Sequence, residues 1–215
     1  MLDTMENEKR ESGIVADSAD LRSVVEKVVS ETPVIDIHTH LFAPEFGSMS
    51  LYGIDDLLTY HYLVAELFRF SSIKPAEFWQ LGKTEKADLI WSTLFVENTP
   101  LSEAALGVIT VLNELGLDPN CENLDEFRGF FRSQTLSSLT EIVMKKANVS
   151  RIVMTNDPFD EEETTVWQTR RVNYKQFAAA LRLDRLLNDW ETTAQKENWS
   201  PSLDQKTISI ARSFL

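Results

Sequence analysis

The sequence has few of the residues that build disulfide-rich, nucleic-acid-binding or membrane-spanning proteins. It contains one cysteine, Cys121, so no internal disulfide can form and a reducing cytoplasmic compartment is expected. Lys and Arg number 21 against 34 Asp and Glu, a net charge of −13. Nucleic acid and anionic membranes are therefore not expected as partners, because phosphate binding needs clustered positive charge. No apolar run approaches the ~20 residues of a membrane-spanning helix.

Histidine is also scarce, and its distribution is informative. The chain of 215 residues has only three histidines, His38, His40 and His61, and all lie within one short window. The remaining composition, 43% hydrophobic and 26% charged, is ordinary for a soluble globular protein of one large or two small domains. The polar, acidic N-terminus, Met1–Glu6, does not resemble a signal peptide.

The segment Val34–His40, Val-Ile-Asp-Ile-His-Thr-His, predicts a buried strand that ends in two metal ligands. Side chains alternate along a strand, so Asp36, His38 and His40 share one face and two imidazoles can lean toward one ion. Neutral imidazole suits Zn²⁺, Mn²⁺ or Fe²⁺, and Asp36 can fix a ring tautomer from outside the ligand set. The alternative is a surface or structural His-x-His, since the motif alone has little specificity.

Helical patterns dominate the first two thirds of the chain. Residues 1–16 are unpatterned and predict a disordered tail. Ser18 is expected to cap an amphipathic helix with one apolar stripe. From 45 to 148 no strand is predicted. One helix is expected from Gly53 to about Phe70. The tryptophans occur at helical spacing and are most simply core residues.

The acidic run Asp160–Glu163 predicts the solvent-exposed start of a helix.

Two further strands are expected, at Val149–Met154 and Phe177–Leu181. The order strand, helices, strand, helix, strand, helix predicts a parallel α/β sheet. Residues capable of chemistry follow each strand: the His38/His40 pair, then Asp157, then Arg182. Parallel α/β folds place their sites at the carboxyl ends of the strands, so we expect these residues to share one edge.

Four motifs in this order resemble uronate isomerases of the amidohydrolase superfamily: Val34–Leu41, Thr59–Tyr62, Thr155–Asp160 and Leu181–Asp184. The resemblance runs from about Ser18 to the end. It implies the first three or so strands of a (β/α)₈ barrel with a large all-helical insertion after the first strand. The expected divisions are a tail 1–16, a first helix and strand 17–44, the insertion 45–148 and two β/α units 149–215. Three strands of eight predict the N-terminal half of a longer enzyme, with a metal-binding Asp beyond Leu215.

The resemblance implies a divalent metal, commonly zinc, held by His38 and His40. It implies interconversion of D-glucuronate with D-fructuronate and of D-galacturonate with D-tagaturonate. His61 and Tyr62 would hold the sugar, and Arg182 would bind its carboxylate or a hydroxyl. His61 and Asp157 are the catalytic candidates, Asp157 as a strand-end carboxylate. A homo-oligomer is compatible with the sequence.

Several residues depart from the family pattern or have a plainer interpretation. Leu63–Glu66 stands where an Arg is common, Asn156 where a second Asp is common, and Leu183 where Pro is common. The alternatives are an Asx turn or helix cap for Asp157, a packed helix residue for His61, a core residue for Tyr62 and a surface ion pair for Arg182. A metal-dependent hydrolase of the same superfamily, an inactive truncated product and an interaction module are the competing functions.

Overall fold

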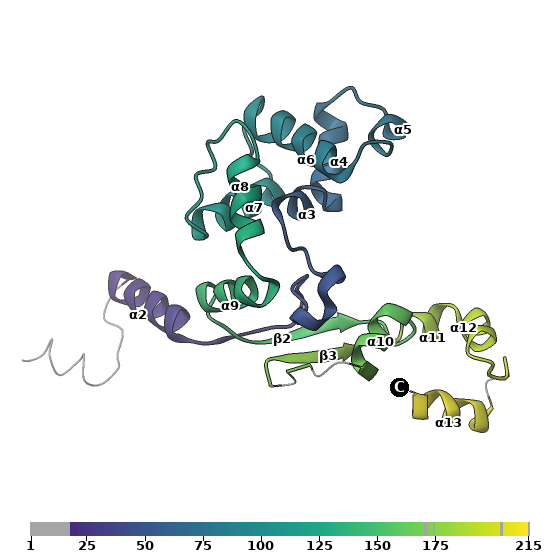
Figure 1. Ribbon diagram of the computed structural model, residues 1–215. Helices are drawn as coiled ribbons and strands as arrows, with labels where there is room; N and C mark the ends of the chain where they lie inside the picture. The colour runs from purple at the N-terminus through teal and green to yellow at the C-terminus, as the bar shows by residue number, and fades with distance from the viewer. Residues whose placement is uncertain (1–17, 170–171, 174, 203, 215) are drawn as a thin grey trace, which may run out of the picture.

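The computed structural model describes residues 18–169, 172–173, 175–202 and 204–214, and the predicted tail 1–16 lies outside this range. The fold is mixed α/β and mostly helical, around a three-stranded sheet of order β1-β2-β3 with every pair parallel (Figure 1). The strands are β1 (Val34–Asp36), β2 (Val149–Asn156) and β3 (Phe177–Leu181). The predicted parallel α/β sheet is therefore confirmed.

The first strand is shorter and more exposed than predicted. It ends at Asp36, and Ile35 and Ile37 are 58% and 72% exposed. The Asp36 Oδ1 atom accepts a hydrogen bond from the His38 amide at 3.0 Å. Such a side-chain bond to the backbone competes with the strand ladder and turns the chain. His38 and His40 consequently lie in the segment that follows the strand, and the prediction of a buried strand through His40 is wrong.

One face of the sheet is covered and the other is open. Ile152 and Met154 on β2 are buried in a cluster with Phe46 and Phe177. This cluster lies under η1 (Pro44–Met49), α9 (Leu136–Lys146) and α10 (Glu161–Thr169). The opposite face carries the exposed Ile35 beside Arg151, its partner in the β1–β2 register. Within the described residues, helices therefore cover only one face of the sheet.

Between η1 and α9, the chain forms a separate group of helices above the sheet (Figure 1). Its described helices are α3 (Ile54–Leu58), α4 (His61–Phe70), α5 (Pro75–Phe78), α6 (Lys83–Trp91) with a π turn Ser92–Val96, α7 (Glu103–Glu114) and α8 (Asp125–Ser133). Their apolar stripes meet in one core that includes Leu67, Phe78, Trp91, Leu112 and Phe127. No strand occurs in the described part of this segment, as expected.

A break divides the helix predicted from Gly53 to Phe70. α3 ends at Leu58, and Tyr60 is extended, with φ −66° and ψ 144°, before α4 begins at His61. The Thr59 hydroxyl donates to the Asp55 carbonyl at 2.6 Å, a local bond that helps to end α3. The single helix is therefore wrong, and the break turns the Tyr60 side chain out of the helical stripe.

Asn148 joins the insertion to the start of the sheet. It has φ 51°, a left-handed conformation that Asn tolerates, directly after α9. Its Nδ2 donates to the carbonyls of Ser30 and Thr32 at 3.2 and 3.0 Å, and its own carbonyl accepts from the Val34 amide at 2.8 Å. One residue therefore aligns the ends of α2 and α9 with the first pair of strands.

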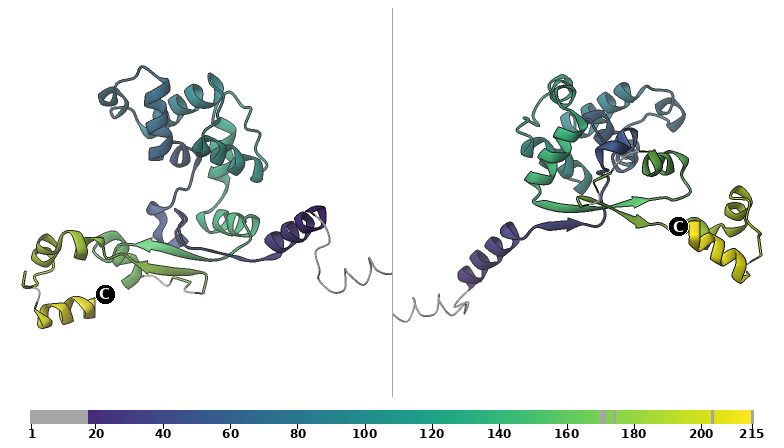
Figure 2. Two further views of the ribbon diagram at one scale, coloured as in Figure 1. Left: turned by 180° about the vertical axis from the view of Figure 1, so that it is seen from behind. Right: turned by 60° about the horizontal axis from the view of Figure 1, so that its bottom comes forward.

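The helices at the two ends of the described chain project away from the sheet. α2 (Ser18–Glu31) extends from one end (Figure 2). Its predicted apolar stripe is exposed, with Val29 at 67%. α11 (Asp184–Asn188), α12 (Trp190–Lys196) and α13 (Gln205–Phe214) lie beyond the other. Asp189, with φ −146° and ψ 47°, is not helical and separates α11 from α12. No helix among the described residues is long and apolar enough to cross a membrane.

Glu163 departs from the solvated helix start predicted for its acidic run. Its side chain is buried, 6% exposed, and accepts hydrogen bonds from Asn156 Nδ2 at 2.7 Å and the Asp157 amide at 2.9 Å. Burial raises the pKa of this carboxyl, the carboxylates of Asp160 and Asp157 raise it further, and the two hydrogen bonds oppose the shift. Glu163 thus ties α10 to the end of β2, whereas Glu161 is exposed as expected.

Trp91→Ala is expected to lower the free energy of unfolding by about 3–5 kcal/mol, because it empties a fully enclosed ring site in the helical core. Trp79, which is 62% exposed contrary to the core prediction, supplies the control. Trp79→Ala is expected to cost less than about 1 kcal/mol. Urea denaturation of the 215-residue chain measures both, and equal costs would contradict the assignment of the core.

Glu163→Gln is expected to stabilise the chain increasingly as the pH rises. A raised pKa means that the folded state binds the proton more tightly than the unfolded state does, so wild-type stability falls from the unfolded pKa up to the folded one. Glu163→Gln has no carboxyl to titrate at this position, so its stability does not fall in this way. Denaturation at about pH 4.5 and about pH 7.5 gives the difference. Glu161→Gln, at an exposed carboxylate, should show no such trend, and a Glu163→Gln effect independent of pH would refute the assignment.

Candidate functional site

Residues from two distant segments meet at the carboxyl end of β1. His38 and His40 follow this strand, and their ring centroids lie 6.2 Å apart at an interplanar angle of 83°. Tyr60 and the first turn of α4, which begins with His61 and Tyr62, approach from the helical insertion. The structure thus brings all three histidines, which the sequence singled out by their clustering, into one neighbourhood.

Tyr60 connects the two segments. Its hydroxyl lies 2.8 Å from His40 Nε2, and the two rings are 4.8 Å apart. The same tyrosine ring lies 4.2 Å from the ring of His61 and 5.5 Å from that of Tyr62. Sequence reasoning assigned no role to Tyr60. Its place between a helix break and the His-Tyr pair was the signal that could have identified it.

The surroundings of His40 favour its neutral form. Burial lowers the pKa of His40, and the nearby imidazoles of His38 and His61 lower it further. Burial, and then the neighbouring Tyr62, raise the pKa of Tyr60. A neutral imidazole has a lone pair for a metal ion or a hydrogen-bond donor. A protonated phenol is such a donor.

The donor set fits part of a metal site. His38 and His40 are imidazole ligands of the kind that zinc and other divalent ions accept. Among the residues that the structure describes, no group of three or more His, Cys, Asp or Glu could hold a metal ion. Catalytic zinc commonly takes three protein ligands. The described residues therefore offer two imidazoles, fewer than the three protein ligands of a catalytic zinc site.

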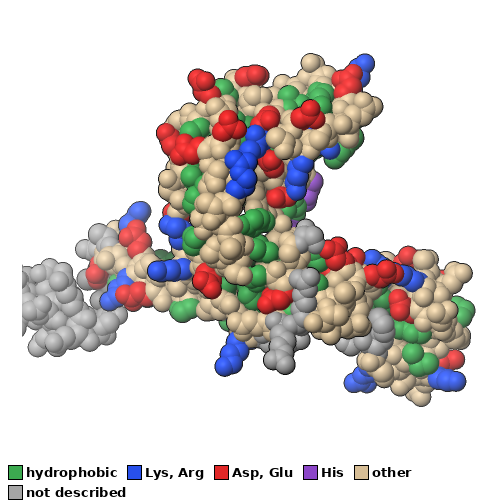
Figure 3. Space-filling model, viewed as in Figure 1, with side chains coloured by type: hydrophobic (Ala, Val, Ile, Leu, Met, Phe, Trp, Pro, Cys, Tyr) green, Lys and Arg blue, Asp and Glu red, His purple; other side chains and the backbone are tan. Residues whose placement is uncertain are grey.

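His61 and Tyr62 lie at the surface. Tyr62 is 61% exposed, so its interpretation as a plain core residue is wrong, and His61 is exposed as well. Their rings are in contact, with centroids 4.1 Å apart. Histidine is visible at the edge of the helical group in the space-filling view (Figure 3). The pair is therefore accessible to a polar ligand arriving at this edge.

Asp157 follows β2 and uses both carboxylate oxygens. Oδ1 accepts a hydrogen bond from the Phe159 amide at 2.9 Å, the Asx turn that was the plainer interpretation. Oδ2 lies 2.9 Å from Nε of Arg185, a residue that sequence reasoning did not identify. These contacts fix the turn after β2 and join it to α11.

Arg182 follows β3 and forms an ion pair. Its Nε lies 3.0 Å from Asp184 Oδ2, and both side chains are more than half exposed. This matches the surface pair considered above and leaves the guanidinium open to solvent. In the described part of the chain, no hydrogen bond or ring contact joins Arg182 or Asp157 to the histidines. The three strand ends share one edge, but their side chains are not in contact.

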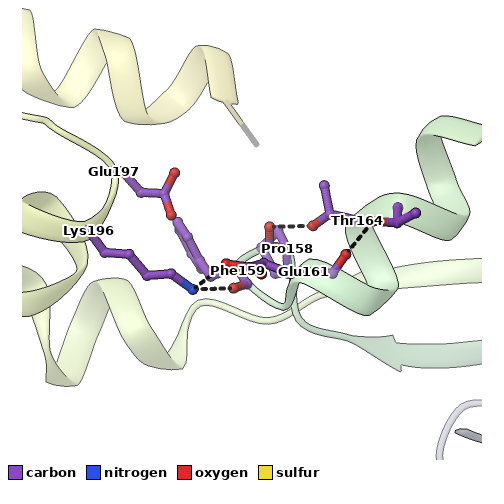
Figure 4. A pocket seen from close by; sticks show the side chains of 7 residues that line it. Pro158, Phe159, Glu161, Thr164, Lys196 and Glu197 are labelled. Carbon is purple, nitrogen blue, oxygen red and sulfur yellow. Dashed lines mark hydrogen bonds and ion pairs between the residues drawn. The ribbon is translucent and has the colours of Figure 1, made fainter.

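A pocket of about 410 Å³ lies beside this edge, between α10 and α12 (Figure 4). Its lining residues are Pro158, Phe159, Glu161, Thr164, Thr165, Lys196 and Glu197. Lys196 Nζ lies 3.4 Å from the Phe159 carbonyl and 3.9 Å from Glu161 Oε1. None of the predicted site residues lines this pocket, so it is separate from the histidine cluster.

Comparison with known proteins identifies a relative among solved structures. No protein-family model matches the sequence, and no curated protein matches it. Among solved structures, the chain is similar to the crystal structure of a uronate isomerase from Bacillus halodurans, with 42% sequence identity and a TM-score of 0.87. The match covers 94% of this chain and 49% of that chain. The chain thus spans about half the length of the relative.

The similarity extends beyond the four motifs, because the match covers 94% of the chain. The two chains are similar in sequence as well as in structure, whereas proteins that share only a fold need not be similar in sequence. The resemblance predicted from the four motifs is confirmed: over 94% of its length this chain is similar to a uronate isomerase, and it corresponds to about half of that enzyme.

Proposed function

We propose that the chain forms part of a divalent-metal-dependent hexuronate isomerase, which interconverts D-glucuronate with D-fructuronate and D-galacturonate with D-tagaturonate. The observation that carries this proposal is the 42% identity to a uronate isomerase over 94% of the chain. The meeting of His38, His40, His61 and Tyr62 at the end of β1 supports it, because these are the residues that the family resemblance assigned to metal and sugar.

The reaction moves a proton from C2 to C1 of the open-chain sugar while the carbonyl group moves from C1 to C2. A bound divalent ion supplies a Lewis acid for the sugar oxygens. His38 and His40 would hold this ion, and the exposed rings of His61 and Tyr62 would hydrogen-bond the sugar hydroxyls. The chain's own contribution is thus to position the substrate at the end of β1.

Arg182 is proposed to bind the uronate carboxylate. Its guanidinium carries a fixed positive charge and offers a planar pair of donors that matches a carboxylate. Its present partner, Asp184, is exposed, so a substrate carboxylate can replace it at small cost. A net charge of −13 makes such a local cation necessary for an anionic substrate.

Asp157 is the candidate general base among these residues, but its contacts favour a supporting role. A base must lie within hydrogen-bond reach of the proton that it removes and be free to approach it. One oxygen of Asp157 closes the turn at Phe159, and the other pairs with Arg185. We therefore propose that Asp157 holds the end of β2 in place and that the base lies in the part of the enzyme that this chain does not cover.

The open face of the sheet is proposed to receive that missing part, which would complete a (β/α)₈ barrel. Parallel sheets are normally buried on both faces, whereas here Ile35 and Ile37 are mostly exposed. β1 and β3 also present unpaired edges within the described sheet, which exposes strand-pairing groups. A polypeptide equivalent to the uncovered half of the relative would cover both features.

The 215-residue chain alone is expected to show no hexuronate isomerisation, and activity is expected when it is co-produced with the uncovered half of the Bacillus halodurans enzyme. His38→Ala and His40→Ala should each reduce that activity by at least about 100-fold, because even residues outside the ligand shell cost up to this much. Conversion of D-glucuronate to D-fructuronate, followed with zinc present, is the measurement.

Matched surface variants test the proposed docking face in the same assay. Ile35→Lys, on the open face, should abolish complementation, whereas Leu101→Lys, at a 76% exposed site in the insertion, should leave it intact. Assembly is followed by gel filtration. Self-association of the chain without activity would show that a second copy occupies the face. Full activity of the chain alone would contradict the proposal that it is one part of the site.

A further inference from the structure

Tyr60 contacts both His40, which follows β1, and the start of α4, which carries His61 and Tyr62. Its backbone carbonyl accepts hydrogen bonds from the amides of Leu63 and Val64 at 3.1 and 3.3 Å, so it starts α4. Its side chain reaches the opposite way, to His40 Nε2 at 2.8 Å. Its ring also contacts the rings of His61 and Tyr62, so movement of the Tyr60 side chain changes the surroundings of the His-Tyr pair at the start of α4.

The tautomer of His40 decides the direction of this hydrogen bond. A phenol remains protonated at neutral pH, and a neutral imidazole offers one N–H donor and one lone pair. When the Tyr60 hydroxyl donates to His40 Nε2, the lone pair of Nε2 is in use and Nδ1 carries the ring proton. A metal ion needs that same lone pair. One nitrogen cannot serve both partners at once.

We infer that the Tyr60 hydroxyl competes with a divalent cation for His40 Nε2, so that metal entry displaces Tyr60 and shifts the start of α4. This inference rests on the metal site of the proposed function. The hydroxyl proton stands at the nitrogen that the cation takes. Loading of the metal is thereby linked to the position of His61 and Tyr62, whose rings rest on the Tyr60 ring.

The local structure allows this exchange. Tyr60 is only partly buried, and within the described residues its hydroxyl has no partner other than the His40 ring. It also lies at the break between α3 and α4, so its displacement does not require a helical turn to unwind. Release of the hydroxyl costs one ordinary hydrogen bond, which water can replace.

The test is a Zn²⁺ titration of the 215-residue chain followed by NMR of its imidazole rings, which number only three. Without metal, His40 is expected as the Nδ1–H tautomer. Tyr60→Phe should bind Zn²⁺ about two- to tenfold more tightly than wild type, the range that an ordinary hydrogen bond contributes. Zn²⁺ should shift the His61 and Tyr62 signals in wild type and shift them less in Tyr60→Phe.

Tyr52→Phe is the matched control, because its hydroxyl donates to the Gln134 carbonyl inside the insertion. It should leave Zn²⁺ affinity unchanged, and His40→Ala should abolish site-specific binding. Unchanged or weaker binding in Tyr60→Phe, with wild-type binding intact, overturns the inference alone; weaker binding would mean that Tyr60 orients His40 for the metal. Absence of His40-dependent binding in wild type would overturn the inference, whereas the proposed function would still be decided by the complementation assay.

Discussion

Parallel pairing of three short strands is the constraint on which the site depends. β1 and β2 are separated in sequence by about a hundred residues of helix, yet they pair directly, and β3 continues the same direction on the other side of β2. Parallel strands put their carboxyl ends at one edge. The histidine segment, the turn at Asp157 and Arg182 consequently share an edge, although each follows a different strand. The bonds of Asn148 set the first of these pairings in place.

The helical insertion contributes to chemistry as well as to stability. Its core is closed by its own apolar residues and is separate from the cluster that covers the sheet. At the break between α3 and α4 the chain leaves that core, and Tyr60 and His61 lie near the end of β1. The open face of the sheet and the apolar stripe of α2 are both exposed. Under the proposed function, a further polypeptide covers the open face and completes the site.

Much of this arrangement follows from local patterns in the sequence. β3 has the predicted bounds, the insertion is helical, and the clustered histidines converge. The predictions that were wrong are explained by hydrogen bonds of polar side chains. The Asp36 side chain ends β1 early, the Thr59 hydroxyl helps to end α3, and Glu163 is buried because it bonds Asn156. The spacing of apolar residues does not reveal such hydrogen bonds. Which residue of another helix or strand a carboxylate contacts depends on tertiary packing.

The most direct test of the central claim is paramagnetic broadening of the chain's NMR signals by Mn²⁺. If the strand ends and α4 form one metal site, the signals of His38, His40 and His61 should broaden at the lowest Mn²⁺ concentration. Arg182 should respond next, because β3 ends at the same edge. First broadening at acidic surface residues such as Asp55–Asp56 or Glu161–Glu162 would instead show that the ion follows the net charge of −13, and would contradict a histidine-centred site.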